Sequence, residues 1–255
     1  MILFQPANGE TDMDDYIAIT YGEQLADVYD LWFSSYEEAA IDLLAQLARG
    51  GRALELGIGT GRVAIPLAAR GVEVHGIDGS EAMVSRLRAR PGGEKISVTM
   101  GNFAHVNVDG KFSLVFTVFN TFFALLAQEE QVRCFSNVAK HLEPGGAFVL
   151  EVFVPDMTHF DQGQSVRATA VTTDRVSLKV SQLDKVNQRM KSQHIVFADG
   201  EIKLFPVEVR YAWPSELDLM ARITGLRLRH RWSGWNREEF TSTSEKHISV
   251  YERPA

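Results

Sequence analysis

The fold is decided by the stretch Glu55-Leu56-Gly57-Ile58-Gly59-Thr60-Gly61, which places three glycines between an apolar run and a run with helical spacing. Residues 53–56 before it predict a strand, and residues 63–69 after it predict a helix that ends at Gly71. Glycines permit a tight turn and a close backbone approach, and the first turn of a helix offers free N–H groups to an anion. The stretch therefore predicts a ligand site between a strand and a helix.

The alternation of strands and helices continues along the first 155 residues. In chain order, the predicted elements are strand 73–77, helix 81–90, strand 96–100, strand 112–119, helix 128–141 and strand 147–153. Ser80 is placed to cap the helix that begins at residue 81. The run 112–119 is nearly all apolar, as expected of a central parallel strand that is covered on both faces. This order is typical of an α/β fold with a doubly wound, mostly parallel sheet.

The pattern changes to antiparallel strands from about residue 166. Val176, Leu178 and Val180 alternate with polar residues, and Asp199-Gly200 lies between two strand-like runs as a hairpin turn. We therefore expect residues 156–213 to form an antiparallel β insertion, and we interpret it as a lid over the substrate.

The last part of the chain is predicted to return to the main sheet. Residues 213–225 predict a helix with Ser215 and Asp218 as a capping box and Gly225 as its stop. Closing strands are expected at residues 226–232 and 247–251.

We divide the chain into four regions of one domain. The predicted regions are a helical leader that covers the active site at 1–50, the cofactor-binding half of the sheet at 51–155, the lid at 156–213 and the closing elements at 214–255. Within the leader, residues 14–48 show helical spacing of apolar side chains.

Polar residues follow the next two predicted strands at the same edge of the sheet. Asp78 lies 17 residues after Gly61, and its carboxylate can accept hydrogen bonds from both hydroxyls of a ribose. Asn102 and Phe103 follow the third strand, where an amide and a ring can hold an adenine by its exocyclic amine and its face. These positions predict a nucleotide-type ligand. Two alternatives stay open: Asp78 could begin a helix cap with Ser80, and Asn102 could be a turn residue.

Over residues 50–155 the sequence resembles the class I S-adenosylmethionine-dependent methyltransferases, most closely the small-molecule members of the antibiotic amino-sugar N-methyltransferase type. Phe119-Asn120-Thr121, the stretch His141 to Gly146, and Tyr29-Asp30 in the leader add to the resemblance. The resemblance implies a Rossmann-like sheet of seven strands. It also implies S-adenosylmethionine as cofactor, S-adenosylhomocysteine as product, and methyl transfer to an N or O atom of a small molecule in natural-product biosynthesis.

The resemblance assigns roles to residues of the predicted sheet edge. Glu55 and the loop glycines would hold the methionine portion, Asp78 the ribose, and Asn102 the adenine, although that last position is commonly Asp in the family. The candidate cofactor residues are Tyr29, Glu55, Gly57, Gly59, Gly61, Asp78, Gly79, Met83, Asn102, Phe103 and Phe119.

Acceptor contacts are expected from the leader, from residues 119–123 after the fourth strand and from the segment 156–213. The candidates are Tyr21, Trp32, Asn120 and Phe123. Aromatic faces attract cations, so the ring of Tyr29 and its neighbours could close over a sulfonium, or they could only pack helices together. Phe123 could equally be a core residue. The sequence singles out no catalytic base.

Two further groups of residues do not indicate a binding site by themselves. Arg227, Arg229 and Arg231 alternate with other residues on one strand and could bind an acidic substrate, or could form a solvated outer face. The seven histidines show no metal-ligand pair at helical spacing, so we expect no metal.

Composition limits the partners. The 255 residues carry a formal net charge of −7, which disfavours nucleic acid and anionic membranes as partners. No apolar run approaches the roughly 20 residues of a membrane span, and the single cysteine, Cys134, fits a reducing cytoplasm. The alternating strands of the insertion could pair between subunits of a homo-oligomer.

Rival functions on the same architecture stay open. A nicotinamide-dependent oxidoreductase is opposed by the G-x-G-x-G spacing, because dinucleotide sites use G-x-G-x-x-G. A nucleic-acid methyltransferase is opposed by the absence of an Asn/Asp-Pro-Pro-aromatic motif at residues 119–122. A protein methyltransferase or a non-catalytic nucleotide-binding protein of the same fold is a further alternative.

Overall fold

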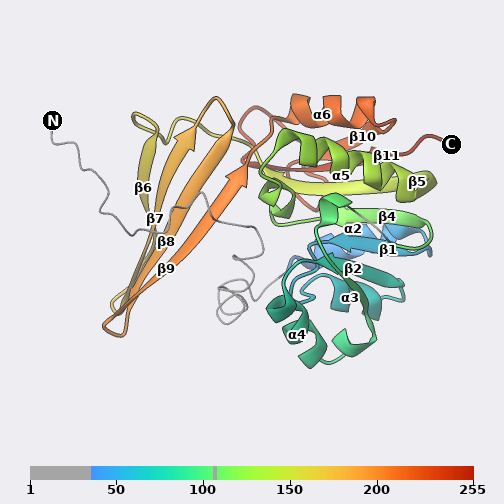
Figure 1. Cartoon of the computed structure of the whole chain (residues 1–255), viewed down its shortest axis with the longest axis horizontal. Coiled ribbons are helices and arrows are strands. Elements are labelled where there is room, and N and C mark those ends of the chain that lie inside the picture. The colour runs from blue at the N-terminus through green and yellow to red at the C-terminus, as the bar shows by residue number, and fades with distance from the viewer. Residues whose placement is uncertain (1–35, 106–107) are drawn as a thin grey trace.

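The computed structural model describes residues 36–105 and 108–255, which form two β-sheets with helices on both faces of the larger one (Figure 1). The larger sheet contains β1 (Ala53–Leu56), β2 (Val74–Asp78), β3 (Ser97–Met100), β4 (Phe112–Thr117), β5 (Leu142–Phe153), β10 (Arg227–Trp232) and β11 (Lys246–Glu252). The smaller sheet contains β6 (Gln164–Val171), β7 (Arg175–Asp184), β8 (Arg189–Ala198) and β9 (Glu201–Arg210).

Five α-helices lie in the part of the chain that the structure describes. They are α2 (Glu38–Ala48), α3 (Ala64–Ala69), α4 (Glu81–Ala89), α5 (Gln128–His141) and α6 (Pro214–Ile223), with 3₁₀ turns at Gly93–Lys95, Phe103–His105 and Thr121–Ala124. In the part of the chain that the structure describes, no helix is both long and apolar enough to cross a bilayer.

The order of strands in the larger sheet is β10-β11-β5-β4-β1-β2-β3. Strand β1 pairs in parallel with both β2 and β4, and β11 pairs antiparallel with β5. The predicted doubly wound, mostly parallel seven-stranded sheet is confirmed. The chain winds outward from β1 on one side and from β4 on the other, and ligands of such sheets bind beyond the carboxyl ends of the strands at this point.

The core consists of two layers, one on each face of the larger sheet. Every residue of β4 is buried, as its apolar sequence predicts. Alternate side chains of this strand serve opposite layers: Val115 packs on the side of Phe135 from α5, whereas Phe116 packs on the side of Leu44 from α2. Because both faces of the sheet are covered, the strand ends are the place where a ligand can reach it.

Several local predictions are confirmed. The Met83 N–H donates to Ser80 Oγ at 3.2 Å and so caps α4, while α5 begins and ends at the predicted residues. Asp199 and Gly200 both have positive φ (54° and 76°) in the turn between β8 and β9, as two-residue hairpins require. Gly225, with φ 83°, follows Thr224 at the end of α6.

The predicted capping box of α6 is wrong. Trp213 precedes the helix without a side-chain cap, and Pro214 occupies the first turn, where a missing N–H costs nothing. Asp218 instead accepts hydrogen bonds on Oδ1 from Arg231 Nη2 at 2.6 Å and from the Tyr251 hydroxyl at 2.9 Å. Its carboxylate therefore joins α6 to β10 and β11.

Among the predicted boundaries, two differ from the structure by more than two residues. Strand β5 begins at Leu142, because the turn residues 143–146 already belong to the strand. Of the predicted helix 14–48, the described part starts as a helix only at Glu38.

The three arginines of β10 do not form one free cationic face. A register shift between Leu228 and His230 interrupts the alternation. Arg227 forms an ion pair with Glu252. Arg229 Nε lies 3.7 Å from Oε2 of the same carboxylate, and Arg231 pairs with Asp218. Of the two interpretations, a solvated and internally paired surface is the one that this geometry supports.

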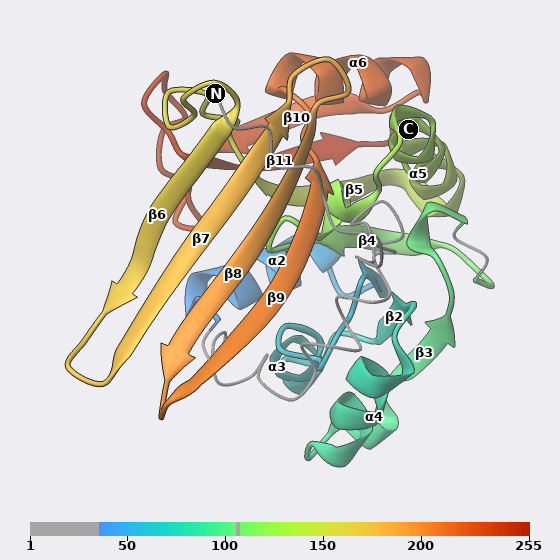
Figure 2. The same cartoon turned by 60° about the vertical axis from the view of Figure 1, so that its left-hand side comes forward.

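The smaller sheet is an antiparallel meander, β6 to β9, as expected of the insertion. Figure 2 shows it as one twisted layer beside the larger sheet. Its base is held by the guanidinium of Arg210, which is 5% exposed. This group donates to Gln131 Oε1 (2.6 Å), Gln188 Oε1 (3.1 Å) and Glu216 Oε1 (2.8 Å), and thereby ties β9 to α5, the β7–β8 turn and α6.

The Arg210→Met variant tests this attachment. We expect the free energy of unfolding to fall by about 3 kcal/mol, because the substitution leaves the partly buried Glu216 carboxylate without its cation. Urea denaturation measures the change. The control is Arg229→Met on exposed strand β10, which should leave the denaturation midpoint almost unchanged. Equal midpoints for the two variants would show that the network adds nothing to stability.

Candidate active site

A cavity of about 700 Å³ lies between the carboxyl edge of the larger sheet and one face of the smaller sheet. Its volume suits a small-molecule ligand. From the larger sheet and its loops, the lining includes Gly57, Gly59, Arg62, Asp78, Gly79, Met83, Asn102, Phe103, Phe119, Asn120, Glu151, Phe153 and Lys246. From the smaller sheet, it includes Lys179, Met190, Ser192, His194, Val207, Glu208 and Val209.

The three loop glycines have positive φ but serve two purposes. At Gly57 (φ 75°) a Cβ would lie 2.4 Å from Thr121 Cγ2, so any other residue would be strained and would have to displace Thr121. At Gly59 (φ 55°) a Cβ would meet no atom within 4 Å, and the residue borders the cavity. Gly61 packs against Leu87 and is outside the lining. The loop therefore keeps a bare backbone toward the cavity at Gly59.

Asp78 holds the glycine loop and borders the cavity at once. Its Oδ2 accepts the Gly59 N–H at 2.7 Å, and its Oδ1 accepts the Ser80 N–H at 2.9 Å. The Gly57 N–H also donates to the carbonyl of Ile77 at 2.8 Å, so the loop continues the hydrogen bonding between β1 and β2. The sequence left two alternatives for Asp78, contact with a ligand and a turn at the start of α4. The structure is compatible with both, because the carboxylate accepts the Ser80 N–H and also borders the cavity.

Glu55 lies behind the loop, 3% exposed, rather than in the cavity lining. Burial raises its pKa well above the usual value, the Asp78 carboxylate raises it further, and Arg62 and the Ala64 N–H oppose the shift. Among the described residues, nothing donates a hydrogen bond to its Oε2. A buried acceptor without a donor is costly. The open side of Gly59 and the Asp78 carboxylate border the cavity and fit an aminoacyl nucleoside such as S-adenosylmethionine, and contact of Glu55 with the ammonium of such a ligand stays a prediction.

Asn102 forms a turn at the cavity edge. Its Oδ1 accepts the Ala104 N–H at 2.8 Å, which leaves the amide nitrogen as a donor toward a ligand. Phe103 and Met83 are buried and line the cavity next to it. The turn interpretation of Asn102 is thus confirmed, and its place in the lining is compatible with ligand contact.

A strained corner follows β4. Phe119 (φ 55°) and Asn120 (φ 66°) are both left-handed, a conformation that costs roughly 1–3 kcal/mol per non-glycine residue. The corner is held by the Phe119 N–H donating to Glu151 Oε2 (3.1 Å) and by Asn120 Oδ1 accepting the Phe153 N–H (2.7 Å). The Arg62 guanidinium lies 3.6 Å from the centre of the Phe119 ring. The conformation aims both side chains at the cavity edge.

Glu151 joins this corner to the end of the chain. Its Oε1 accepts hydrogen bonds from Trp235 Nε1 and Lys246 Nζ, both at 3.2 Å, while Oε2 serves Phe119. The side chain is 7% exposed. Sequence reasoning missed it, although a single carboxylate within the apolar run 147–153 is the signal that could have indicated it.

The face of the smaller sheet supplies polar residues that sequence reasoning also missed. Lys179, Ser192 and His194 lie among Met190 and the valines of β9 in the lining. Burial lowers the pKa of His194, and the nearby Lys179 lowers it further. The sequence placed an insertion here, but its alternation did not identify which of the two faces would meet the cavity.

The remaining predicted site residues have different outcomes. Phe123 is fully buried against Phe153, with ring centres 5.0 Å apart, and is a core residue outside the lining. Tyr21, Tyr29 and Trp32 lie outside the described residues. Within residues 36–105 and 108–255, no three His, Cys, Asp or Glu side chains come together as a metal site would need.

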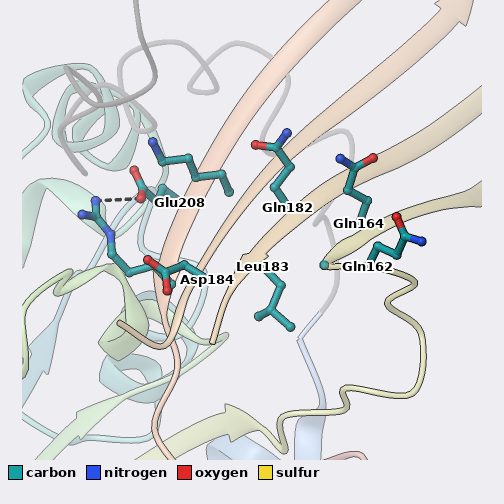
Figure 3. A pocket seen from close by; sticks show the side chains of 9 residues that line it. Gln162, Gln164, Gln182, Leu183, Asp184 and Glu208 are labelled. Carbon is teal, nitrogen blue, oxygen red and sulfur yellow. Dashed lines mark ion pairs between the residues drawn. The ribbon is translucent and has the colours of Figure 1, made fainter. Parts of the chain in front are cut away.

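A second, polar pocket of about 410 Å³ lies on the smaller sheet. Figure 3 shows Gln164 and Gln182 side by side in it, with Asp184 and Glu208 farther along the groove. The Glu208 carboxylate is paired with Arg189 at 2.6 Å, marked by the dashed line. Glu208 borders both pockets.

Comparisons with known proteins agree with the geometry. A family model described as a methyltransferase domain matches residues 53–146. The CcbJ methyltransferase from Streptomyces caelestis is 40% identical with a TM-score of 0.88, over 94% of this chain and 100% of that one. The cypemycin N-terminal methyltransferase of a Streptomyces species is 28% identical over 91% of this chain and 97% of its own length. CalS10, an amino pentose methyltransferase from Micromonospora echinaspora solved with bound S-adenosylmethionine, has a TM-score of 0.68 at 21% identity, over 89% of this chain and 96% of that one.

The Glu151→Gln variant tests the support of the strained corner. An amide cannot accept from Phe119 on one side and from Trp235 and Lys246 on the other, so we expect unfolding free energy to fall by about 2 kcal/mol. The indole N–H resonance of Trp235 should shift in the NMR spectrum. Glu129→Gln on exposed helix surface is the control and should change neither quantity. An unmoved indole resonance in Glu151→Gln would contradict the assignment.

Proposed function

Since this chain belongs to the S-adenosylmethionine-dependent methyltransferases that act on small molecules, we propose that it methylates the nitrogen of a small amine. The observation that carries the proposal is the single cavity that joins the Asp78-bound glycine loop to the face of the smaller sheet. One wall suits the cofactor and the other suits an acceptor. Two solved structures of similar fold, the sugar N-methyltransferase KedS8 and the glycopeptide N-methyltransferase MtfA, are named for methylation at nitrogen. The cypemycin methyltransferase is named for the N-terminus, where a peptide carries its amine, and these names support nitrogen as the acceptor atom.

We assign the cofactor to the wall formed by the larger sheet. In this proposal Asp78 binds the ribose hydroxyls, and Glu55 with the backbone of Gly57 and Gly59 holds the aminoacyl end. Asn102 then donates to an adenine ring nitrogen. Phe103, Met83, Gly79 and the Phe119 edge complete this wall. Bound S-adenosylmethionine supplies a methyl group on a positively charged sulfur.

In this proposal the residues of the chain position the acceptor nitrogen against the methyl group of the cofactor. A departing thioether needs no proton, so no acid is required, and the acceptor nitrogen must arrive with its lone pair free. The apolar side chains of Phe153, Met190 and Val209 line the cavity and exclude water from the space between the two walls. Asn120, on the strained corner, has its Oδ1 committed to Phe153 and acts by shaping the wall.

The remaining parts of the interpretation are proposals as well. We place residues 156–213 as the cover of the acceptor and residues 1–50 as the leader of the site. Negative net charge favours a small acceptor over a nucleic acid. A cytoplasmic location and pairing of copies through the smaller sheet stay predictions.

Cofactor binding tests the first half of the proposal. We expect S-adenosylhomocysteine to bind in calorimetry while NADH does not, and Asp78→Asn to weaken binding about tenfold, because the amide is a poorer acceptor for the ribose hydroxyls. Asp109→Asn, on an exposed loop, is the matched control and should bind as the wild type does. Preference for NADH, or unchanged affinity in Asp78→Asn, would remove the assignment.

Turnover tests the second half. Incubated with S-adenosylmethionine and a panel of amines, phenols and carboxylic acids, the protein should yield S-adenosylhomocysteine with amines, as measured by mass spectrometry. The rate should rise with pH until the acceptor amine is deprotonated, since only the neutral nitrogen attacks. Methylation confined to phenols, or tight cofactor binding without turnover of any panel member, would contradict an amine acceptor.

A further inference from the structure

Three basic side chains form a row across the smaller sheet. Arg167 of β6 pairs in register with Lys179 of β7, and Lys179 pairs with His194 of β8. Directly paired residues of an antiparallel sheet project from the same face with their Cβ atoms about 5 Å apart. Since Lys179 and His194 line the cavity, the row begins at the exposed Arg167 and runs into the acceptor wall.

The two cations of this row, Arg167 and Lys179, are not offset by acids of the described chain. Neither hydrogen bonds nor ion pairs link Arg167, Lys179 or His194 to other described side chains. The carboxylate of Asp156, which Arg167 influences weakly, is engaged by Thr158 and His159. Burial lowers the pKa of Lys179, and Arg167 lowers it further, so the two cations repel each other. Like charges placed opposite one another destabilise a sheet.

Other cations of the cavity have partners. Lys246 donates to both Glu37 and Glu151, and Arg62 lies over the ring of Phe119. Lys179 differs from them, because it is half-buried, borders the cavity and has no counter-ion within the described residues. An uncompensated cation in such a place costs stability, and a bound anion removes that cost.

We propose that Lys179, together with His194 and Arg167, binds a negatively charged group of the methyl acceptor, a carboxylate or a phosphate. This inference rests on the proposed function, because the acceptor is the molecule that occupies the smaller-sheet wall. The acceptor then combines three parts: an amine that faces the glycine-loop edge, an apolar body against Met190 and Val207, and an acid at the basic row. A different occupant, the carboxylate of the cofactor itself, is distinguished by the test.

The experiment compares four proteins: wild type, Lys179→Met, Lys179→Arg and Lys203→Met. Lys203 lies on the same sheet, is 57% exposed, pairs with Glu201 and does not border the cavity, so it provides a matched control. Inorganic phosphate and acetate are titrated into each protein, with and without saturating S-adenosylhomocysteine, and binding is followed by ³¹P and ¹³C NMR relaxation. Cofactor affinity and melting temperature are measured in parallel.

We expect Lys179→Met to weaken anion binding about tenfold, since a charge-assisted hydrogen bond is lost. Lys179→Arg and Lys203→Met should bind anions within about twofold of the wild type, and all four should bind S-adenosylhomocysteine equally. The ligand-free Lys179→Met protein should melt at the wild-type temperature or above it, because a repulsion is removed. The preferred anion, phosphate or acetate, identifies the acid of the acceptor.

Other results overturn the inference. Wild-type protein that binds neither anion, or Lys179→Met that binds them as the wild type does, shows that the row is not an anion site. Loss of S-adenosylhomocysteine affinity in Lys179→Met assigns the cation to the cofactor instead. If the wild type fails to bind S-adenosylhomocysteine at all, the proposed function fails, while the anion titrations of the cofactor-free protein still decide the role of the row.

Discussion

The rest of the site depends on the hydrogen bond from the Gly59 N–H to the Asp78 carboxylate. It joins the loop after β1 to the end of the neighbouring parallel strand β2, and it fixes a backbone that three left-handed glycines would otherwise leave free to adopt many conformations. Because the same carboxylate borders the cavity, a ligand that bonds to it meets a loop already in place. Conformational entropy is thus lost at folding rather than at binding.

Long-range polar contacts hold the other parts of the cavity. Glu151 fixes the strained corner at Phe119 through donors that come from three distant positions in the chain, and Arg210 fixes the base of the smaller sheet against two helices. Both side chains are almost fully buried, and such groups remain stable only when every polar atom finds a partner. The two walls therefore keep a defined separation, as positioning of a nucleophile against a methyl carbon requires.

The parts of the molecule that sequence could predict are those encoded within a few neighbouring residues. The glycine loop, the cap at Ser80, the buried strand β4 and the hairpin at Asp199-Gly200 all rest on local conformational preferences. Glu151 and Lys179 escaped prediction because their significance arises from partners, or from the lack of them, that only the pairing of distant strands reveals. The capping box at Asp218 failed for the same reason, since tertiary contacts with Arg231 and Tyr251 outcompeted the local bond.

The division of the cavity between two sheets has an evolutionary consequence. The wall opposite the glycine loop comes from one uninterrupted segment, β7 to β9, whose alternate side chains point away from the cavity and whose attachment depends on residues at its base. Substitutions along the cavity-facing positions can therefore accumulate without disturbing the hydrogen bonds around Asp78 or the two-layered core. Enzymes of this architecture can diverge toward new acceptors while methyl-donor recognition is inherited unchanged.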